Sequence, residues 1–314
     1  MGRAREIGSS KADLPERVFA IKMRISFRKT TETILLPEGC EGPITVSDET
    51  VRGYYERFPE ERRLSTGVSQ LEAARTKALI RRFAPQPPSA VLDVGGGAGA
   101  YAFWLANQGY EVHLMDLSTR LVELATDRNK KAGHPLASVG EGDARALPIA
   151  DGYLDVVLLL GPLYHLTRVE ERAQALAEAA RVLKPGGVLF AACLTRWASL
   201  FDGLVHRRFS NPAFGTMASE DVATGQHRNP GLHPDWFTTA YMHRPDEFAE
   251  ELRSTGLEVV GIFGLEGPAV LLPDFDERWA DPTEREAMIG VAETVESEPA
   301  LHGVSPHLLG VCRA

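Results

Sequence analysis

Between residues 91 and 194, short apolar segments alternate with segments long enough to form helices. The segment 154–161, LDVVLLLG, is predominantly apolar, which is typical of a strand buried on both faces of a sheet. Strands are predicted at 91–94, at 111–115, within 137–148, at 154–161 and at 186–194, with helices at 100–107, 118–131 and 170–183 between them. This order predicts an α/β fold in which helices cover both faces of a mostly parallel sheet.

A glycine-rich turn, VLDVGGGAGA at 91–100, follows the first predicted strand. Glycine permits a positive φ and lets a ligand approach the main chain, and the next helix directs its free N–H groups at the same place. Asp116, at the end of the second strand, is placed to bind ribose hydroxyls, and Asp143, after the third strand, to bind an adenine amine. The pattern predicts a nucleoside site, with plain turn or cap roles for the glycines and aspartates as the alternative.

Three regions surround this alternating segment. Residues 1–45 are predicted as a basic, flexible extension, with a basic contact arm as the alternative. Residues 46–87 predict a helical cap, with helices at 47–58 and 67–83 before the Pro-rich segment 84–90. Residues 195–245 are rich in aromatic side chains and histidine, and we interpret them as an insertion rather than another strand–helix unit. Beyond it we expect a helix at 245–254, a strand at 257–263, a helix at 282–296 and a strand at 306–314.

Composition narrows the classes of function. The formal net charge of −9 argues against a nucleic-acid partner, which requires a basic surface. The three cysteines are widely spaced and form neither a disulfide framework nor a zinc pattern, which indicates a reducing compartment. No apolar run approaches the roughly 20 residues that span a bilayer. We therefore expect a cytoplasmic protein without a membrane or nucleic-acid partner.

Four motifs carry a family resemblance: VLDVGGGAGAYAFWLA, VHLMDLS, EGDARALPIADGYLDVVLLLGPLYHL and RVLKPGGVLFAA. In this order and spacing the chain resembles the class I S-adenosylmethionine (SAM) methyltransferases, in particular the small-molecule branch of the ubiquinone/menaquinone-biosynthesis type. The resemblance implies a Rossmann-like, seven-stranded sheet of order 3-2-1-4-5-7-6 with an antiparallel last strand. It makes residues 88–314 a SAM-binding domain and residues 195–245 a lid over the substrate.

The resemblance also implies roles for individual residues. Gly95, Gly97 and Gly99 would line the methionine and ribose parts of SAM, and Asp93 would bind loop amides or face the tail of the ligand. Asp116, with Leu117 beside it, would bind the ribose; Asp143 and the Ala144 amide would bind the adenine; and Leu160 and Gly161 would close over the cofactor.

Methyl transfer requires an acceptor atom in line with the methyl–sulfur bond at about 3–3.5 Å, and a base where the acceptor must lose a proton. His165 is the first candidate for this base and Tyr164 the second, since both follow the fourth strand; a hydrogen-bonded loop residue is the alternative for His165. Tyr54 and Tyr55 are adjacent on the first helix, and we expect one to face the site and the other to pack. His206, His227, His233 and His243 lie in the insertion and match no metal-ligand spacing, so we expect no metal.

The sequence therefore predicts a SAM-dependent methyltransferase that acts on a small aromatic or heteroaromatic metabolite, at oxygen, nitrogen or carbon, in a setting such as natural-product biosynthesis. An NAD(P)-dependent oxidoreductase would share the glycine turn and Asp116 but does not need the GDAR and LKPGG motifs. A SAM-binding member that is non-catalytic or catalyses another reaction, and a tRNA or rRNA methyltransferase, remain as alternatives.

Overall fold

The computed structural model describes residues 46–57, 60–230, 233 and 236–314. The predicted basic extension, residues 1–45, lies outside the described residues. The cap, the SAM-binding domain and the lid, as separate functional regions, stay predictions.

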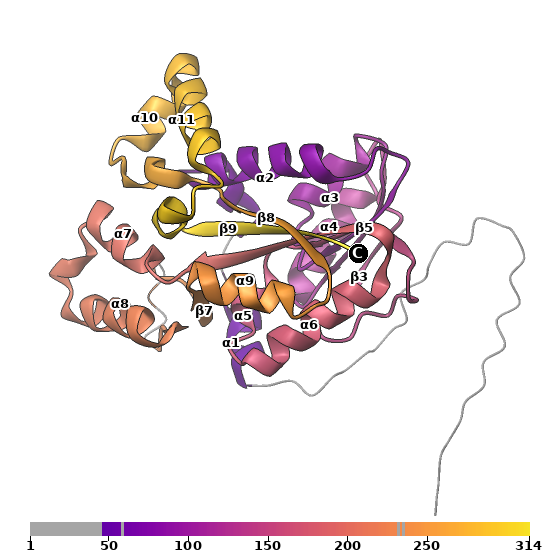
Figure 1. Ribbon diagram of the computed structural model, residues 1–314, viewed down its shortest axis with the longest axis horizontal. Coiled ribbons are helices and arrows are strands. Elements are labelled where there is room, and N and C mark those ends of the chain that lie inside the picture. Colours follow the sequence, from indigo (N-terminus) through magenta and orange to yellow (C-terminus); the bar gives the residue numbers. More distant parts are fainter. Residues whose placement is uncertain (1–45, 58–59, 231–232, 234–235) are drawn as a thin grey trace, which may run out of the picture. The chain divides into compact units, whose positions relative to one another are not determined.

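A mostly parallel sheet organises the described part of the chain (Figure 1). Five parallel strands are β1 (Ala90–Val94), β2 (Glu111–Asp116), β3 (Ser138–Glu141), β4 (Leu154–Leu159) and β5 (Leu183–Thr195). On the other side of β5, β9 (His307–Arg313) inserts antiparallel between β5 and β8 (Glu258–Gly264). The order β3-β2-β1-β4-β5-β9-β8 confirms the predicted arrangement, because β8 and β9 are the predicted sixth and seventh strands.

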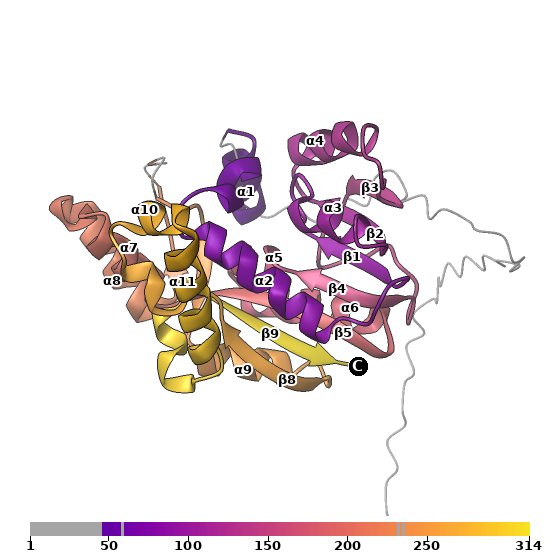
Figure 2. The same cartoon turned by 90° about the horizontal axis from the view of Figure 1, so that it is seen from above.

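Helices cover the two faces of this sheet (Figure 2). The first face carries α2 (Ser69–Phe83), α3 (Ala100–Ala106) and α4 (Thr119–Asn129), and the second carries α6 (Val169–Val182) and α9 (Pro245–Arg253). Successive residues of β4 pack against the helices on opposite faces. Leu158 packs in the cluster of α2 and α3, and Leu159 packs in the cluster of α6 and α9. Burial on both faces explains why the central strands are continuously apolar.

The insertion contains α7 (Ala198–Val205), η2 (Arg208–Ser210), α8 (Pro212–Thr224), β6 (Gln226–His227) and β7 (Ala240–His243). A strand in this insertion was not foreseen from the sequence. Strand β7 pairs in parallel with the last residues of β5, at Leu194 and Thr195, so the described residues contain more than seven strands. Strand β5 runs past the end of β4, and β7 pairs with the backbone groups exposed there.

The remaining elements surround the carboxyl edge of the parallel strands. Helix α1 (Val46–Tyr55) ends earlier than the predicted 47–58 and leads into η1 (Glu60–Ser65). After β4 comes the single helical turn α5 (Pro162–His165). After β8 the chain forms η3 (Gly267–Leu271), α10 (Phe275–Ala280), α11 (Pro282–Val295) and η4 (Pro299–Val304). The start of α2 packs on this segment through Leu71, Phe275 and Met288, which places the first turn of α2 beside α10 and α11.

In the described part of the chain, each helix is too short or too polar to cross a membrane. Cys193 and Cys312 are buried free thiols. The cytoplasmic location stays a prediction.

Substitution of Gly99 tests the fold. It begins α3 with φ of +82°, and a Cβ atom there would lie 2.7 Å from the Phe103 ring. We expect Gly99→Ala to lower the free energy of unfolding by about 2–4 kcal/mol, from left-handed strain and overpacking together. Urea denaturation measures this. Gly133→Ala is the matched control, because a Cβ there meets no atom within 4 Å, and it should change stability by no more than about 0.5 kcal/mol.

Candidate active site

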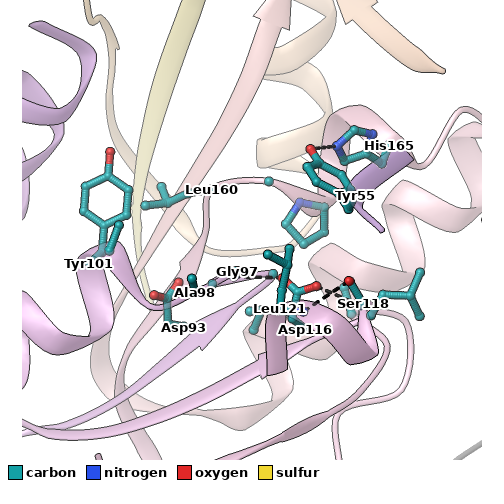
Figure 3. A pocket seen from close by; sticks show the side chains of 18 of the residues that line it. Tyr55, Asp93, Gly97, Ala98, Tyr101, Asp116, Ser118, Leu121, Leu160 and His165 are labelled. Carbon is teal, nitrogen blue, oxygen red and sulfur yellow. Dashed lines mark hydrogen bonds between the residues drawn. The ribbon is translucent and has the colours of Figure 1, made fainter. Parts of the chain in front are cut away.

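A cavity of about 390 Å³ lies at the carboxyl edge of the parallel strands. Its wall combines the turn after β1, the ends of β2 and β4, and side chains of α1, α2 and β9. Figure 3 shows Asp93 and Tyr101 toward one side of this cavity and Tyr55 with His165 toward the other. Ligands of open α/β sheets bind at this edge, so the cavity is the candidate active site.

The glycine turn is fixed to the end of β2 by main-chain donors. Gly95 N–H donates to the Met115 carbonyl at 2.8 Å, and Gly97 N–H donates to Asp116 Oδ2 at 2.8 Å. The other Asp116 oxygen, Oδ1, accepts from Ser118 N–H at 2.8 Å. Gly95 has a φ of +69°, and a Cβ there would overlap the Pro162 ring at 2.7 Å. The turn can therefore approach both β2 and α5 only without side chains.

Asp93 is the most unusual carboxylate of the cavity wall. It is 1% exposed, and its Oδ2 has no hydrogen-bond partner among the described residues. Burial, and then the charge of Asp116, raise the pKa of Asp93 to about 7. Burial also raises the pKa of Asp116, although the amides of Ser118, Gly97 and Leu117 oppose this. An orphaned carboxylate oxygen beside a second carboxylate suits a cationic ligand.

Asp143 and Ala144 also line the cavity, as do Leu117, Leu160 and Gly161. The carboxylate of Asp143 receives the Arg145 N–H at 2.8 Å and the Arg145 guanidinium at 2.6 Å. This pairing fixes the carboxylate and was not foreseen from the sequence. Gly99 is not among the residues that line the cavity; its positive φ and its contact with Phe103 serve the turn.

Tyr55 and His165 form a hydrogen-bonded pair at the aromatic side of the cavity (Figure 3). The His165 Nδ1 lies 3.2 Å from the Thr239 carbonyl, which can only accept, so Nδ1 carries the proton. Nε2 is then the acceptor for the Tyr55 hydroxyl at 2.8 Å. Burial lowers the pKa of His165 to about 4, against the opposing effect of the Thr239 carbonyl. His165 is therefore neutral at physiological pH.

The structure separates the two neighbouring tyrosines of α1. Tyr55 lines the cavity, whereas Tyr54 is not among the lining residues and packs edge-on against Phe237 of the insertion. Tyr164 lines the cavity and is buried, with its ring also against Phe237.

The histidines of the insertion do not line the cavity. His227 contacts Asp221, and His243 contacts Glu251. His227 and Asp221 are both buried, and His243 is buried against the partly exposed Glu251, so the two pairs stabilise the insertion and its junction with α9.

Sequence reasoning missed a group of charged residues on the wall. Arg63 donates to both oxygens of Glu72, at 2.5 and 3.0 Å. His307, at the start of β9, lines the cavity beside them and contacts Glu266. These residues come from η1, α2, β9 and the segment after β8, and no local motif connects them.

Comparisons with known proteins agree with this geometry. A family model described as a methyltransferase domain matches residues 92–191. The ubiquinone/menaquinone biosynthesis C-methyltransferase of Bordetella parapertussis is 31% identical over 209 residues, which is 64% of this chain and 75% of that protein. The protein of the same name from Acidiphilium cryptum is 28% identical over 212 residues, 65% of this chain and 79% of that protein.

A solved structure shares the fold. It is the geranyl diphosphate C-methyltransferase of Streptomyces coelicolor A3(2), in complex with Mg²⁺, geranyl diphosphate and S-adenosyl-L-homocysteine, with a TM-score of 0.53 and 15% identity. The likeness covers 86% of this chain and 99% of that one. An open α/β sheet with a glycine turn and two carboxylates at its carboxyl edge is typical of nucleoside-binding Rossmann-like enzymes, and the match to a methyltransferase domain identifies this one as a methyltransferase. The chain belongs to the class I SAM-dependent methyltransferase family.

The wall of the cavity fits SAM. The orphaned Oδ2 of Asp93 is available for the ammonium group of its methionine part. Asp116 is held by main-chain donors with acceptor capacity left for ribose hydroxyls. Gly95 and Gly97 leave the space that side chains would otherwise fill.

Asp93 predicts a pH dependence of SAM binding. Below about pH 7 the Asp93 carboxyl group is protonated and cannot form an ion pair with the ammonium group of SAM. Above about pH 7 it is ionised and can form this ion pair. We expect SAM affinity to rise with pH, by up to about tenfold per unit, as the pH passes from about 5.5 to about 7.5, a range in which the SAM amino group stays largely protonated. Calorimetric titration measures it. Asp93→Asn should bind weakly with a flat pH profile, and a profile as steep as that of the wild type would contradict the assignment.

Asp116 predicts an effect on the product complex. We expect Asp116→Ala to weaken binding of S-adenosyl-L-homocysteine by at least about tenfold, because two charge-assisted hydrogen bonds to the ribose would be lost. Fluorescence or calorimetric titration gives the dissociation constant. Asp127→Ala is the control, since this carboxylate on α4 is exposed and pairs with Lys130, the residue directly after the helix. Equal affinity of the two variants would reject the ribose role.

Proposed function

We propose that this chain transfers the methyl group of SAM to a small aromatic or heteroaromatic metabolite without a metal ion. One observation carries the proposal: a single cavity joins the carboxylates Asp93 and Asp116 to a wall formed by Tyr55, Tyr164 and His165. A ring-shaped acceptor fits such a wall, because aromatic rings pack edge-on or offset against one another. Two relatives named as ubiquinone/menaquinone biosynthesis C-methyltransferases support a small-molecule acceptor.

SAM supplies a methyl group already activated by the positive sulfur. The remaining contribution of the protein is to orient the acceptor, exclude water and remove a proton where the acceptor carries one. The Tyr55 hydroxyl donates to His165, and this hydrogen bond fixes the tyrosine ring on the cavity wall. With a pKa of about 4, His165 is a weak base near neutral pH, and we propose that the Tyr55–His165 pair positions the acceptor.

The test is methyl transfer from radiolabelled SAM to a panel of phenols, naphthols, hydroquinones and hydroxylated heteroaromatics. Labelled product from at least one of these classes is the expected result. Binding of S-adenosyl-L-homocysteine without label transfer to any of them would favour a non-catalytic or repurposed member. Label transfer to bulk tRNA or rRNA alone would favour the nucleic-acid alternative.

The Tyr55–His165 pair predicts a particular kinetic signature. If it positions the acceptor, Tyr55→Phe and His165→Gln should raise KM for the acceptor by about tenfold, the effect of one or two lost hydrogen bonds, and should lower kcat less than KM rises. Steady-state kinetics with the best acceptor of the panel separate the two constants. A fall of kcat by about 10² or more with KM unchanged would instead make His165 the base.

A further inference from the structure

At the end formed by β9 and the start of α2, the cavity is lined by a second group of polar side chains: Arg63, Glu72 and His307. The residues that fit SAM follow strands β1, β2 and β3. In the sheet these three strands lie on one side of β4. On the other side come β5 and then β9, whose first residue, His307, pairs with Leu194 of β5. Ala192 and His307 both line the cavity there. In the strand order, the residues that fit SAM and these two residues lie on opposite sides of β4, and we place the methyl acceptor on the side of β5 and β9.

Glu266 holds the His307 ring in one orientation. The Glu266 Oε2 accepts from the Ser305 hydroxyl at 2.7 Å and from the main-chain N–H of His307 at 3.1 Å. Its Oε1 lies 2.5 Å from Nδ1 of His307. Glu266 is 1% exposed. Its carboxylate therefore cannot rotate freely, and water cannot replace His307 as its hydrogen-bond partner.

This contact also fixes the tautomer. Since a carboxylate accepts, Nδ1 of His307 carries its proton toward Glu266, and Nε2 is the ring atom that gains or loses a proton. Within the described residues, no hydrogen bond to His307 Nε2 is found, while the side chain is 16% exposed on the cavity wall. A histidine that acts as a base is oriented when one ring nitrogen donates to a carboxylate and the other faces an open cavity. His307 has this arrangement.

We propose that His307 is the general base that removes a proton from a hydroxyl group on the aromatic acceptor, with Glu266 as its positioning residue. This inference rests on the proposed function, and it names the acceptor class more narrowly as hydroxylated aromatic rings. The hydroxyl donates to Nε2 in the ground state. In the reaction its proton moves to Nε2, and the O–H bonding pair stays with the acceptor and forms the new bond to the methyl carbon. The carbon–sulfur pair leaves with the sulfur, and the imidazolium returns its proton to water.

The charges around His307 suit this role. Glu72 of α2 lies 3.8 Å from Nδ1, Glu266 contacts the same atom, and Arg63 of η1 pairs with Glu72. Burial by itself would lower the pKa of His307, but Glu72 and Glu266 outweigh it and raise the pKa above its ordinary value. His165, on the same cavity, is shifted in the opposite direction. Neutral His307 therefore binds a proton more strongly than His165 does.

A bound cation would be an alternative occupant of this end. The nearest oxygens of Glu72 and Glu266 and a ring nitrogen of His307 lie within 4.8 Å of one another. In this arrangement, however, Arg63 already neutralises Glu72, and Glu266 already has three donors, from Ser305, the His307 amide and the His307 ring. Both carboxylates therefore have hydrogen-bond donors without a bound cation, and this favours the histidine base over a cation site.

Turnover of the best acceptor from the labelled-SAM panel tests the proposal. We expect His307→Gln to lower kcat by about 10²-fold or more while binding of S-adenosyl-L-homocysteine stays within about twofold of the wild type. His206→Gln is the matched control, because His206 is exposed and does not line the cavity. Imidazole added to His307→Ala should restore part of the turnover. Wild-type kcat in His307→Gln would overturn the proposal and leave the proposed function intact.

The pH profile distinguishes a positioning role of Glu266 from a merely structural one. Wild-type kcat should rise with pH to a plateau, because only neutral His307 accepts the proton. Glu266→Gln removes the negative charge that raises the pKa of His307, so the midpoint should move to lower pH by about one unit and the plateau should fall. Glu286→Gln, on the exposed side of α11, should leave the profile unchanged. A lower plateau in Glu266→Gln with an unshifted midpoint would reject the positioning role.

Two measurements without turnover complete the test. In ¹⁵N NMR of the imidazole rings, the His307 signals, identified by their loss in His307→Gln, should show the proton on Nδ1 in the neutral form; a proton on Nε2 would overturn the inference. Calorimetric titration with Mg²⁺, Mn²⁺ and Zn²⁺ should show no stoichiometric site that His307→Gln removes, and such a site would assign the cluster to a cation instead. If the wild type binds S-adenosyl-L-homocysteine but methylates no acceptor, the proposed function fails and His307 has no proton to remove, whatever its tautomer.

Discussion

The hydrogen bond from the Gly97 amide to the Asp116 carboxylate joins the turn after β1 to the end of β2, and the cofactor side of the cavity depends on it. It forms because Gly97 adopts a φ of +56°, which a residue with a side chain rarely does. The same turn brings Asp93 close enough to Asp116 for their charges to interact. Two buried carboxylates at one turn are costly without a cation, and a ligand with a positive charge relieves this cost.

The insertion is coupled to the other side of the cavity through a few contacts around β7. Thr239, directly before β7, accepts from His165 and so sets the tautomer that receives the Tyr55 hydroxyl. Phe237 packs its ring against Tyr54, Tyr164 and His165. Pairing of β7 with the end of β5 holds this segment in place. The wall that would orient an acceptor is therefore built jointly by the parallel sheet and by the insertion.

Two histidines on one cavity occupy opposite electrostatic environments. His165 is surrounded by aromatic rings and a carbonyl, and burial keeps it neutral. His307 lies between two glutamates, which favour its protonated form. The first environment suits a fixed hydrogen-bond acceptor and the second suits a group that exchanges protons. This division of roles agrees with the strand order, which separates the cofactor residues of β1–β3 from the residues of β5 and β9.

The sequence alone determined the parallel sheet and the residues of the glycine turn, because these follow from local periodicity and from turns that need glycine. The strand order came from the resemblance of four motifs to a known family. The sequence could not decide which of Tyr54 and Tyr55 faces the cavity, since neighbours on a helix point about 100° apart and only packing selects one. It also gave no sign of β7 in the sheet or of the contact between Glu266, Glu72 and His307. Those depend on side chains from distant segments that meet only when helices and strands pack, and no local pattern encodes such a meeting.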